Sequence, residues 1–324
     1  MSGFFDSLAV MFGREPVKPT APTEAAKALL AFKRTKEQVA LRRKAIKEEK
    51  IHYTPSRKWR LRRWASIIIV NLLFVLSFQA DIQLLEGALT ASRFAGFHLA
   101  DLNAALQVML AYKHVVINLA IGAITVLIAW WLLGGRTFCS WACPYHLLGE
   151  IAEALHLKLA AKGWASDHPL HRGTRSVMYV VFAGLALVTG YTVFETINPV
   201  GILSRAMIYG AGLALAWVVL LLLIEVFYSR RFWCRYMCPV GLTYGLVGAA
   251  AAPVRITYNA ENCLHEGECR KVCMVPHVLS MTRMSWNQDV KVDVGADCTR
   301  CGMCVEVCPT KALTFKVKGL EGLG

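Results

Sequence analysis

Four apolar segments occupy the middle of the chain, and they constrain its fold more than any other feature. They are residues 64–79, 115–133, 177–194 and 206–228. Each is close to the roughly 20 residues that a helix needs to cross the hydrocarbon core of a membrane. The chain is also 56% hydrophobic, which is too apolar for an ordinary soluble protein. We therefore predict an α-helical integral membrane protein with four transmembrane helices, in a membrane domain over residues 64–252.

Basic residues are distributed unevenly around these segments, and this predicts which helix ends face the cytoplasm. Five stand directly before the first segment: Arg57, Lys58, Arg60, Arg62 and Arg63. The connection 81–112 has Arg93 as its single basic residue. Since lysine and arginine collect on the cytoplasmic side of a membrane, we expect both termini there and the loops 81–112 and 195–205 outside. The net charge of +14 reflects this asymmetry, so nucleic acid is not an expected partner.

Residues 1–63 are polar and basic, and we predict that they form a cytoplasmic extension. The apolar side chains over 4–12 give a weak signal for contact with the lipid interface. Residues 23–50 predict a charged helix with Thr23 as its N-cap. Apolar positions are sparse in it, which favours a helix that is exposed to solvent or lies on the membrane surface. No cleavable signal peptide is expected, because a polar segment precedes the first apolar run.

The eleven cysteines occur in short local sets, which indicates metal ligation rather than a disulfide framework. One set, over residues 298–309, has the spacing C-x2-C-x2-C-x3-C-P, which is typical of a bacterial ferredoxin cluster loop. A zinc knuckle is the alternative, since zinc also takes four thiolates. Structural zinc sites usually use two separated C-x2-C pairs, so the spacing favours iron–sulfur. No C-x-x-C-H sequence occurs, and a covalently attached c-type haem is not expected.

A second cysteine group, over residues 263–273, has the same length as the 298–308 group. Three of its cysteines match three of the later ones in position, namely Cys263, Cys269 and Cys273 against Cys298, Cys304 and Cys308. Glu266 occupies the place of Cys301. Residues 253–324 therefore predict an α+β, ferredoxin-like domain with two 4Fe-4S clusters, on the cytoplasmic side.

In two-cluster ferredoxins the fourth cysteine of each motif ligates the other cluster. One predicted ligand set is complete: Cys273, Cys298, Cys301 and Cys304. The other consists of Cys263, Cys269 and Cys308, with a corner that is open or filled by Glu266. His265 and Glu268 are lesser candidates for that corner. A vacant corner predicts a 3Fe-4S cluster, and an empty, degenerate site is the alternative, which the register of three thiols disfavours.

The four remaining cysteines repeat one pattern, C-x3-C-P, after the second and fourth apolar segments. They are Cys139 and Cys143 in the first unit and Cys234 and Cys238 in the second. Cysteines four residues apart share one face of a helix, and a proline directly after the second predicts a kink or an end. Two units would bring four thiols together at the cytoplasmic surface of the membrane. A metal or cluster site, redox-active dithiols and small buried residues are the three interpretations, and the repetition disfavours the last.

These segments resemble the NapH/MauN group of polytopic ferredoxin-type proteins. The resemblance lies in F-C-S-W-A-C-P at 138–144, E-T-I-N-P-V at 195–200, C-P-V-G at 238–241, and the segments 263–279 and 298–308. It implies four membrane helices, two C-x3-C-P motifs and a cytoplasmic domain with two four-iron clusters. Carried over by position, the ligands are Cys263, Cys269, Cys273, Cys298, Cys301, Cys304 and Cys308. Glu266 and the basic extension depart from the family's pattern.

The resemblance also implies a function. The best-known members are quinol-dehydrogenase subunits of periplasmic nitrate reductase systems, in the bacterial inner membrane. Electrons would pass from the quinol pool, through a periplasmic ferredoxin-like or cytochrome c partner subunit, towards a periplasmic reductase. One alternative is a maturation factor that supplies electrons or metal to a periplasmic enzyme such as methylamine dehydrogenase. Another is entry of electrons from cytoplasmic ferredoxin or NAD(P)H, although no Gly-rich dinucleotide motif is present.

Ionisable residues near the membrane are further candidates. Glu225 lies inside the fourth apolar segment, where a charge is costly and is usually paired or functional. Two interpretations of Glu225 are open: an ion pair with Arg230, Arg231 or Arg136, and a role in proton transfer or quinone binding. Asp101, Glu195 and Asn198 flank the outer side and are weaker candidates for accepting quinol protons. His98, His114 and His146 lie near the predicted membrane boundaries, and b-type haem is not predicted from them.

Overall fold

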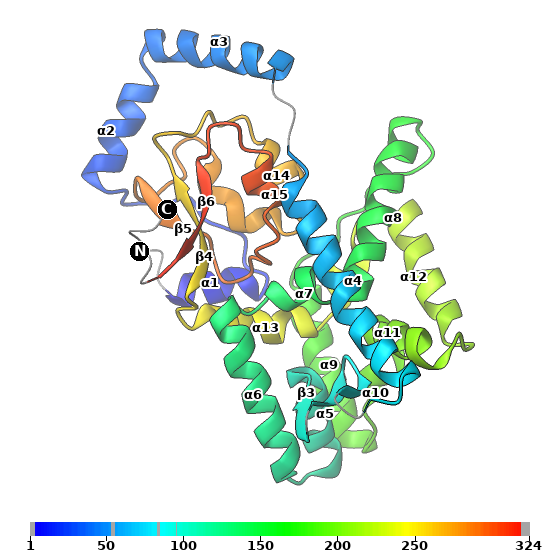
Figure 1. Cartoon of the computed structure of the whole chain (residues 1–324). Coiled ribbons are helices and arrows are strands. Elements are labelled where there is room, and N and C mark those ends of the chain that lie inside the picture. The colour runs from blue at the N-terminus through cyan, green and yellow to red at the C-terminus, as the bar shows by residue number, and fades with distance from the viewer. Residues whose placement is uncertain (1–3, 53–55, 83–84, 95, 319–324) are drawn as a thin grey trace.

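A computed structural model describes residues 4–52, 56–82, 85–94 and 96–318. It has a helical part, built mainly from residues 58–249, and a C-terminal part with a small sheet (Figure 1). The two parts have separate apolar cores, one centred on Tyr145, Phe194 and Trp233, the other on Ile256, Tyr258 and Leu313. The site described below lies where these two cores meet.

The apolar runs form helices, but most are shorter than predicted. Within the described residues, one helix is long and apolar enough by length and composition to cross a membrane, namely α4 (Lys58–Gln79). The second and third runs form α6 (Ile117–Leu133) and α9 (Thr174–Thr189). The fourth run is divided, because α11 (Pro199–Tyr209) ends before Gly210, which has a φ of 98°, and α12 (Leu215–Phe227) begins after it. The expectation of one continuous helix over 206–228 is therefore wrong.

The first expected outer loop is more structured than predicted. Three strands form an antiparallel sheet in the order β1 (Leu85–Ala88), β2 (Ala91–Phe94) and β3 (Phe97–Ala100). Helix α5 (Leu102–Tyr112) follows, capped by Asp101, which accepts hydrogen bonds from the backbone N–H groups of Asn103 and Ala104. Asp101 and the first turn of α5 are buried. The segment therefore folds back into the helical part.

The second expected outer loop is similar. Helix α10 (Val193–Ile197) leads into α11, whose cap Asn198 accepts a hydrogen bond from the N–H of Val200. Asn198 and most of the first turns of α11 are buried. The two connections thus place the N-termini of two short helices inside the helical part, and hydropathy did not reveal this because each segment is short.

Each C-x3-C-P unit ends one helix and starts another. The first contains α7 (Thr137–Trp141), and Pro144 starts α8 (Pro144–Ala161). The second contains the π-helical turn η1 (Trp233–Met237), followed after Pro239 by α13 (Val240–Ala249). The predicted break at each proline is confirmed. Because the break falls at the second cysteine, the two cysteines of a unit do not share one continuous α-helix.

The C-terminal part is α+β, as predicted. Its sheet has the order β5-β4-β6, all antiparallel, with β4 (Val254–Asn259) between β5 (Lys291–Asp293) and β6 (Leu313–Val317). Three short helical turns complete it: α14 (Glu268–Lys271), η2 (Pro276–Thr282) and α15 (Met303–Glu306). The short turns α14 and α15 occupy the two cysteine motifs.

The N-terminal extension lies against the rest of the protein. Helix α1 (Phe4–Met11) packs on α13, and Met11 is buried between Leu242 and Ala296, so its side chain lies in a protein core rather than at a lipid interface. The predicted charged helix is divided into α2 (Glu24–Lys33) and α3 (Lys36–His52), and the N-cap Thr23 is confirmed. Lys33 Nζ donates to the carbonyl oxygens of Ala260 and Cys263, which ties α2 to the second cysteine motif.

Candidate iron–sulfur and thiol site

The structure brings together the four cysteines of the complete predicted set. Cys273 comes from the earlier motif and lies within electrostatic range of Cys298, Cys301 and Cys304 of the later one. Three of these thiols are buried: Cys273, Cys298 and Cys304. The backbone N–H of Arg300 donates to Cys298 Sγ at 3.4 Å, and Gly302 adopts the left-handed conformation with a φ of 76° at the start of α15. The loop therefore wraps its thiols inward.

The donor set suits a bound cluster. Burial raises the pKa of the Cys273 and Cys304 thiols well above its usual range, so a nearby positive charge is needed to keep them as thiolates. Iron supplies that charge, and thiolates are the ligands of iron–sulfur clusters. Among the described residues, no group of three or more His, Cys, Asp or Glu is arranged to hold a single metal ion.

The incomplete predicted set also comes together. Cys263, Cys269 and Cys308 line a small cavity of about 40 Å³. The N–H groups of His265 and Ala312 donate to the sulfurs of Cys263 and Cys308, each at 3.3 Å. Hydrogen bonds to ligand sulfurs are among the factors that set the reduction potential of an iron–sulfur cluster, so these contacts suit a cluster site.

Glu266 lines the same cavity, in the place where the other motif has a cysteine. Its Oε1 is buried and, in the described part of the chain, has no hydrogen-bond partner. The two lesser candidates are engaged elsewhere: His265 Nδ1 lies 2.9 Å from the carbonyl oxygen of Thr282, and Glu268 forms an ion pair of 2.6 Å with Lys271. Of the three, Glu266 is thus the one with a buried oxygen left over.

The four C-x3-C-P thiols lie in the core of the helical part. Cys143 and Cys238 are buried in this core, and Cys139 and Cys234 pack against it. Thiols from the two units are within electrostatic range of each other. The guanidinium group of Arg136 is also within electrostatic range of Cys139. The two units therefore do meet, although their cysteines are almost one hundred residues apart in the sequence.

Both C-x3-C units touch the chain beside the complete ligand set. Ser140 Oγ donates to the carbonyl oxygen of Thr299 at 2.6 Å, and Trp141 Nε1 donates to that of Arg300 at 3.2 Å. In the second unit, Arg235 Nε donates to the carbonyl oxygen of Met274 at 2.8 Å. Cys234 packs against the cores of both parts. The two C-x3-C units are therefore in direct contact with the C-terminal part, next to the predicted cluster ligands.

A buried charge network fixes this contact. Asp297, next to Cys298, accepts from Arg136 at 2.6 Å and from Arg175 at 2.9 Å, and its other oxygen lies 2.7 Å from His277 Nε2. Burial alone raises the pKa of Asp297, but the two guanidinium groups outweigh it and hold that pKa well below its usual range. The carboxylate therefore stays ionised and joins α7 and α9 to the cluster loop.

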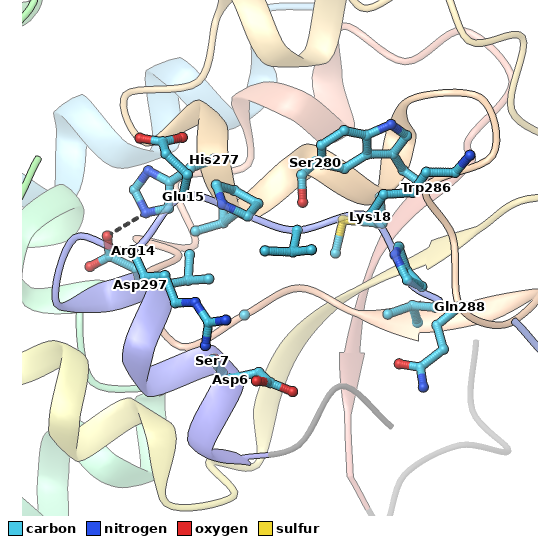
Figure 2. A pocket seen from close by; sticks show the side chains of 18 of the residues that line it. Asp6, Ser7, Arg14, Glu15, Lys18, His277, Ser280, Trp286, Gln288 and Asp297 are labelled. Carbon is cyan, nitrogen blue, oxygen red and sulfur yellow. Dashed lines mark hydrogen bonds and ion pairs between the residues drawn. The ribbon is translucent and has the colours of Figure 1, made fainter. Parts of the chain in front are cut away.

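Figure 2 shows the cavity that borders this network. His277 and Asp297 stand at one end of a cavity of about 400 Å³ between the N-terminal extension and the C-terminal part. Arg14 and Lys18 come from the extension, and Trp286 comes from the C-terminal part. The extension therefore covers the back of the cluster loop.

Glu225 is fully buried, as its place in an apolar segment predicts. Its Oε1 accepts from Tyr145 Oη at 3.1 Å and from the N–H of Trp233 at 3.2 Å. The arginines expected as partners form their ion pairs with other acids: Arg136 with Asp297, Arg230 with Asp167 and Arg231 with Glu153. Glu225 Oε2 is buried without a hydrogen-bond partner among the described residues.

The other ionisable candidates separate into two groups. Burial and the nearby Asp101 raise the pKa of Glu195 to about 7, and Asn198 Nδ2 lies 3.5 Å from Glu195 Oε1. The candidates Asp101, Glu195 and Asn198 therefore gather in one region. His98 and His114 are exposed, and His146 is buried with its Nε2 at 2.6 Å from Arg63 Nη1.

Sequence reasoning missed two residues that complete these groups. Tyr244 donates to Asp101 Oδ1 at 2.8 Å, and Tyr145 donates to Glu225. Glu150 was also missed, although it pairs with Arg60 at 2.6 Å and Arg63 at 2.8 Å. The available signal was weak: a tyrosine within the apolar stretch 240–252 and an acid within the helix after the first C-x3-C-P motif.

Comparison with known proteins matches both parts of this site. A family model described as a 4Fe-4S binding domain matches residues 116–162 and 211–254, which contain the two C-x3-C-P units. A second model, also described as a 4Fe-4S binding domain, matches residues 296–314, which contain the ferredoxin motif. No solved structure matches the chain.

Several relatives are similar over most of their length. The methylamine utilization ferredoxin-type protein MauN of Paracoccus denitrificans is 33% identical over 68% of this chain and 78% of its own. The ferredoxin-type protein NapH of Escherichia coli is 29% identical over 82% of this chain and 93% of its own. MauN of Methylorubrum extorquens is 30% identical over 68% of this chain and 76% of its own.

Proposed function

Because the chain belongs to the family of ferredoxin-type proteins that includes NapH and MauN, we propose that it carries electrons from the quinol pool to a periplasmic redox system. It is an iron–sulfur electron-transfer protein, with two kinds of 4Fe-4S binding domain in one chain. The observation that carries the proposal is the direct contact of both C-x3-C units with the chain beside the complete ligand set. Ser140 donates to Thr299, which follows Cys298, and Arg235 donates to Met274, which follows Cys273.

In this proposal the predicted cysteines hold two clusters. Cys273, Cys298, Cys301 and Cys304 hold one, and Cys263, Cys269 and Cys308 hold the other together with Glu266. When bound, iron–sulfur clusters supply one-electron redox chemistry. The chain's own residues do the rest: the buried thiols keep water away, N–H groups stabilise the thiolates, and Asp297 locks the loop onto α7 and α9 through its arginines.

A multi-pass place in the bacterial inner membrane is part of the proposal. Helix α4 has a largely exposed apolar surface. Of its most apolar 18-residue stretch, 28% is buried, whereas a core helix of a soluble protein is mostly buried. Exposed apolar side chains also cover α6, α9 and α12, for example Ile121, Val180 and Leu220. Since large exposed apolar surfaces indicate a partner or a membrane, we assign these faces to lipid and both termini to the cytoplasm.

The partner on the periplasmic side would be a ferredoxin-like or cytochrome c subunit, and this chain would act as the membrane subunit of a quinol dehydrogenase. A second candidate function is maturation of a periplasmic enzyme such as methylamine dehydrogenase. It is favoured by one observation, the 33% identity to a relative that is named for methylamine utilization.

The test uses the purified full-length protein with its clusters intact. Mixing it with a short-tailed ubiquinol or menaquinol under anaerobic conditions should bleach the visible absorbance of the clusters and change their EPR signals. A wild-type protein that no quinol reduces, alone or with its periplasmic partner, would overturn the proposal. A strain that lacks this chain distinguishes the two candidate functions. If the chain is a maturation factor, the periplasmic enzyme itself should be incompletely assembled in that strain.

A further inference from the structure

A long apolar groove runs between α4 and α6 and has a volume of about 720 Å³. Its walls include Val70 and Phe74 of α4, Val126 and Trp130 of α6, and Phe138 of α7. Side chains of the β1–β2–β3 sheet lie along it as well, and Arg300 of the cluster loop is part of its lining. We call this space the α4–α6 groove. Its volume lies in the range of pockets for small organic ligands.

One polar pair interrupts the apolar walls. Tyr244 Oη donates to Asp101 Oδ1 at 2.8 Å, and both side chains line the groove. Asp101 Oδ2 accepts from the N–H groups of Asn103 and Ala104, each at 3.1 Å. A carboxylate has about four acceptor positions, so three are used and one is left. Capping α5 explains the bonds to Oδ2, but it does not explain why a tyrosine from α13 reaches Oδ1.

The groove is also close to both redox-related groups of the protein. Cys139 lies within electrostatic range of Asp101 and of Tyr244. Tyr244 stacks on Phe138 with ring centroids 4.9 Å apart, and Phe138 is next to Cys139. Arg300 lies between Cys298 and Cys301 and lines the same space. A ligand in the groove would therefore be separated from the C-x3-C-P cysteines, and from the cluster loop, by one side chain in each case.

These properties fit one kind of ligand. The apolar, aromatic walls suit a flat ring with a hydrocarbon tail, and the polar pair suits a ring hydroxyl or carbonyl oxygen. The polar pair contains no cation, so it offers nothing to the phosphate of a phospholipid headgroup. The cation in the lining, Arg300, already donates to the carbonyl oxygens of Val254 and Cys298. We propose that the α4–α6 groove is the binding site for quinol, with its ring against Phe138 and Trp130 and one ring oxygen hydrogen-bonded to the Asp101–Tyr244 pair. This inference rests on the proposed function and adds the place and the residues.

Binding can be measured without electron transfer. The probe is 2-heptyl-4-hydroxyquinoline N-oxide, a fluorescent analogue of a quinol, titrated into the full-length protein with intact clusters in lipid nanodiscs. Val70→Trp and Val126→Trp fill the groove from two helices and are expected to weaken binding at least about 10-fold, which corresponds to about 1.4 kcal/mol. Leu72→Trp is the matched control, because Leu72 is exposed on α4 outside the groove lining and should leave binding unchanged.

The polar pair is tested by two conservative changes. Asp101→Asn keeps a good helix cap and Tyr244→Phe keeps the ring, so the fold should persist in both. Each change is expected to weaken binding of the probe about 3- to 10-fold, which is the range for the loss of one hydrogen bond. Helical circular dichroism and the cluster EPR signals check that each variant is folded.

The outcomes separate this inference from the proposed function. If the wild-type protein binds no probe and no quinol reduces its clusters, the proposed function fails. If the wild type is reduced by quinol but both groove-filling variants bind the probe like Leu72→Trp, the groove is not the site. If Val70→Trp instead displaces a co-purified phospholipid or a partner subunit, with probe binding unchanged, the groove belongs to that ligand and the inference is overturned.

Discussion

Ser140, between the two cysteines of the first C-x3-C-P unit, donates a hydrogen bond of 2.6 Å to the carbonyl oxygen of Thr299, which follows Cys298. Both groups are buried. The contact joins two motifs that are 159 residues apart and that carry different cysteine patterns. It holds the C-x3-C-P cysteines of the helical part directly against the cluster loop.

The first prediction concerns the thiol group. If the four C-x3-C-P cysteines take part in electron transfer, replacing Cys139, Cys143, Cys234 and Cys238 by Ser should abolish reduction of the protein by quinol. The EPR signals of the ferredoxin-like part should persist, because its own ligands are unchanged. Stopped-flow absorbance measures the loss. Unchanged reduction in the fourfold variant would show that these thiols are structural.

The second prediction concerns the fourth ligand of the incomplete set. Glu266→Ala removes the buried carboxylate from the cavity of Cys263, Cys269 and Cys308, and the cluster there should become a 3Fe-4S cluster with its own EPR signal. Glu266→Cys should instead alter the signal of the four-iron cluster. Glu268→Ala is the control, because Glu268 lines the same cavity but pairs with Lys271. If both changes at Glu266 leave the spectrum as it is, the site is empty or Glu266 is not a ligand.

The third prediction concerns the loop that carries the later motif. Gly302 has a φ of 76°, and a Cβ there would lie 2.9 Å from the ring of Trp59 at the start of α4. Gly302→Ala should therefore destabilise the protein by about 1–3 kcal/mol, through backbone strain and the displaced tryptophan. Iron content per chain and thermal unfolding measure this. Gly184→Ala is the control, because nothing lies within 4 Å of a Cβ at that helical position.

The fourth prediction concerns Glu150, whose carboxylate is buried against Arg63. Burial alone raises the pKa of Glu150, but Arg63 and Arg231 outweigh it and the pKa lies below its usual range. Glu150→Gln leaves Arg63 buried without a carboxylate, so it should cost about 3–5 kcal/mol of stability. Glu24→Gln, which breaks the exposed pair with Lys27, should cost at most about 1 kcal/mol.

The sign of the pH dependence follows from the lowered pKa. The stabilisation by Glu150 is present above about pH 4.3, where a glutamate of the unfolded chain is ionised. It is lost as the pH falls through the lower pKa of the folded protein. The difference in unfolding temperature between wild type and Glu150→Gln should therefore shrink below about pH 4. A difference that stays constant down to pH 3 would contradict this account.

Much of the site was predictable where the information is local. The loop from Cys298 to Cys304 sets three thiols within seven residues, and the proline after each C-x3-C unit ends a helix by its own geometry. The helical prediction failed over 206–228, because Gly210 breaks the run and a hydropathy average does not register a single backbone angle. The structure of the loop 81–112 was underestimated, because its short strands and α5 pack against α4, α6 and α9, which are distant in the sequence.

The sequence by itself determined the cysteine spacing, the apolar helices and the substitution of Glu266, because each depends on residues that are neighbours in the chain. Only the tertiary structure decided which of these features meet. Tyr244 reaches Asp101 across 143 residues, and Arg136 reaches Asp297 across 161. Such contacts depend on how whole helices pack, since a buried carboxylate is tolerated only where a distant donor or cation arrives to satisfy it.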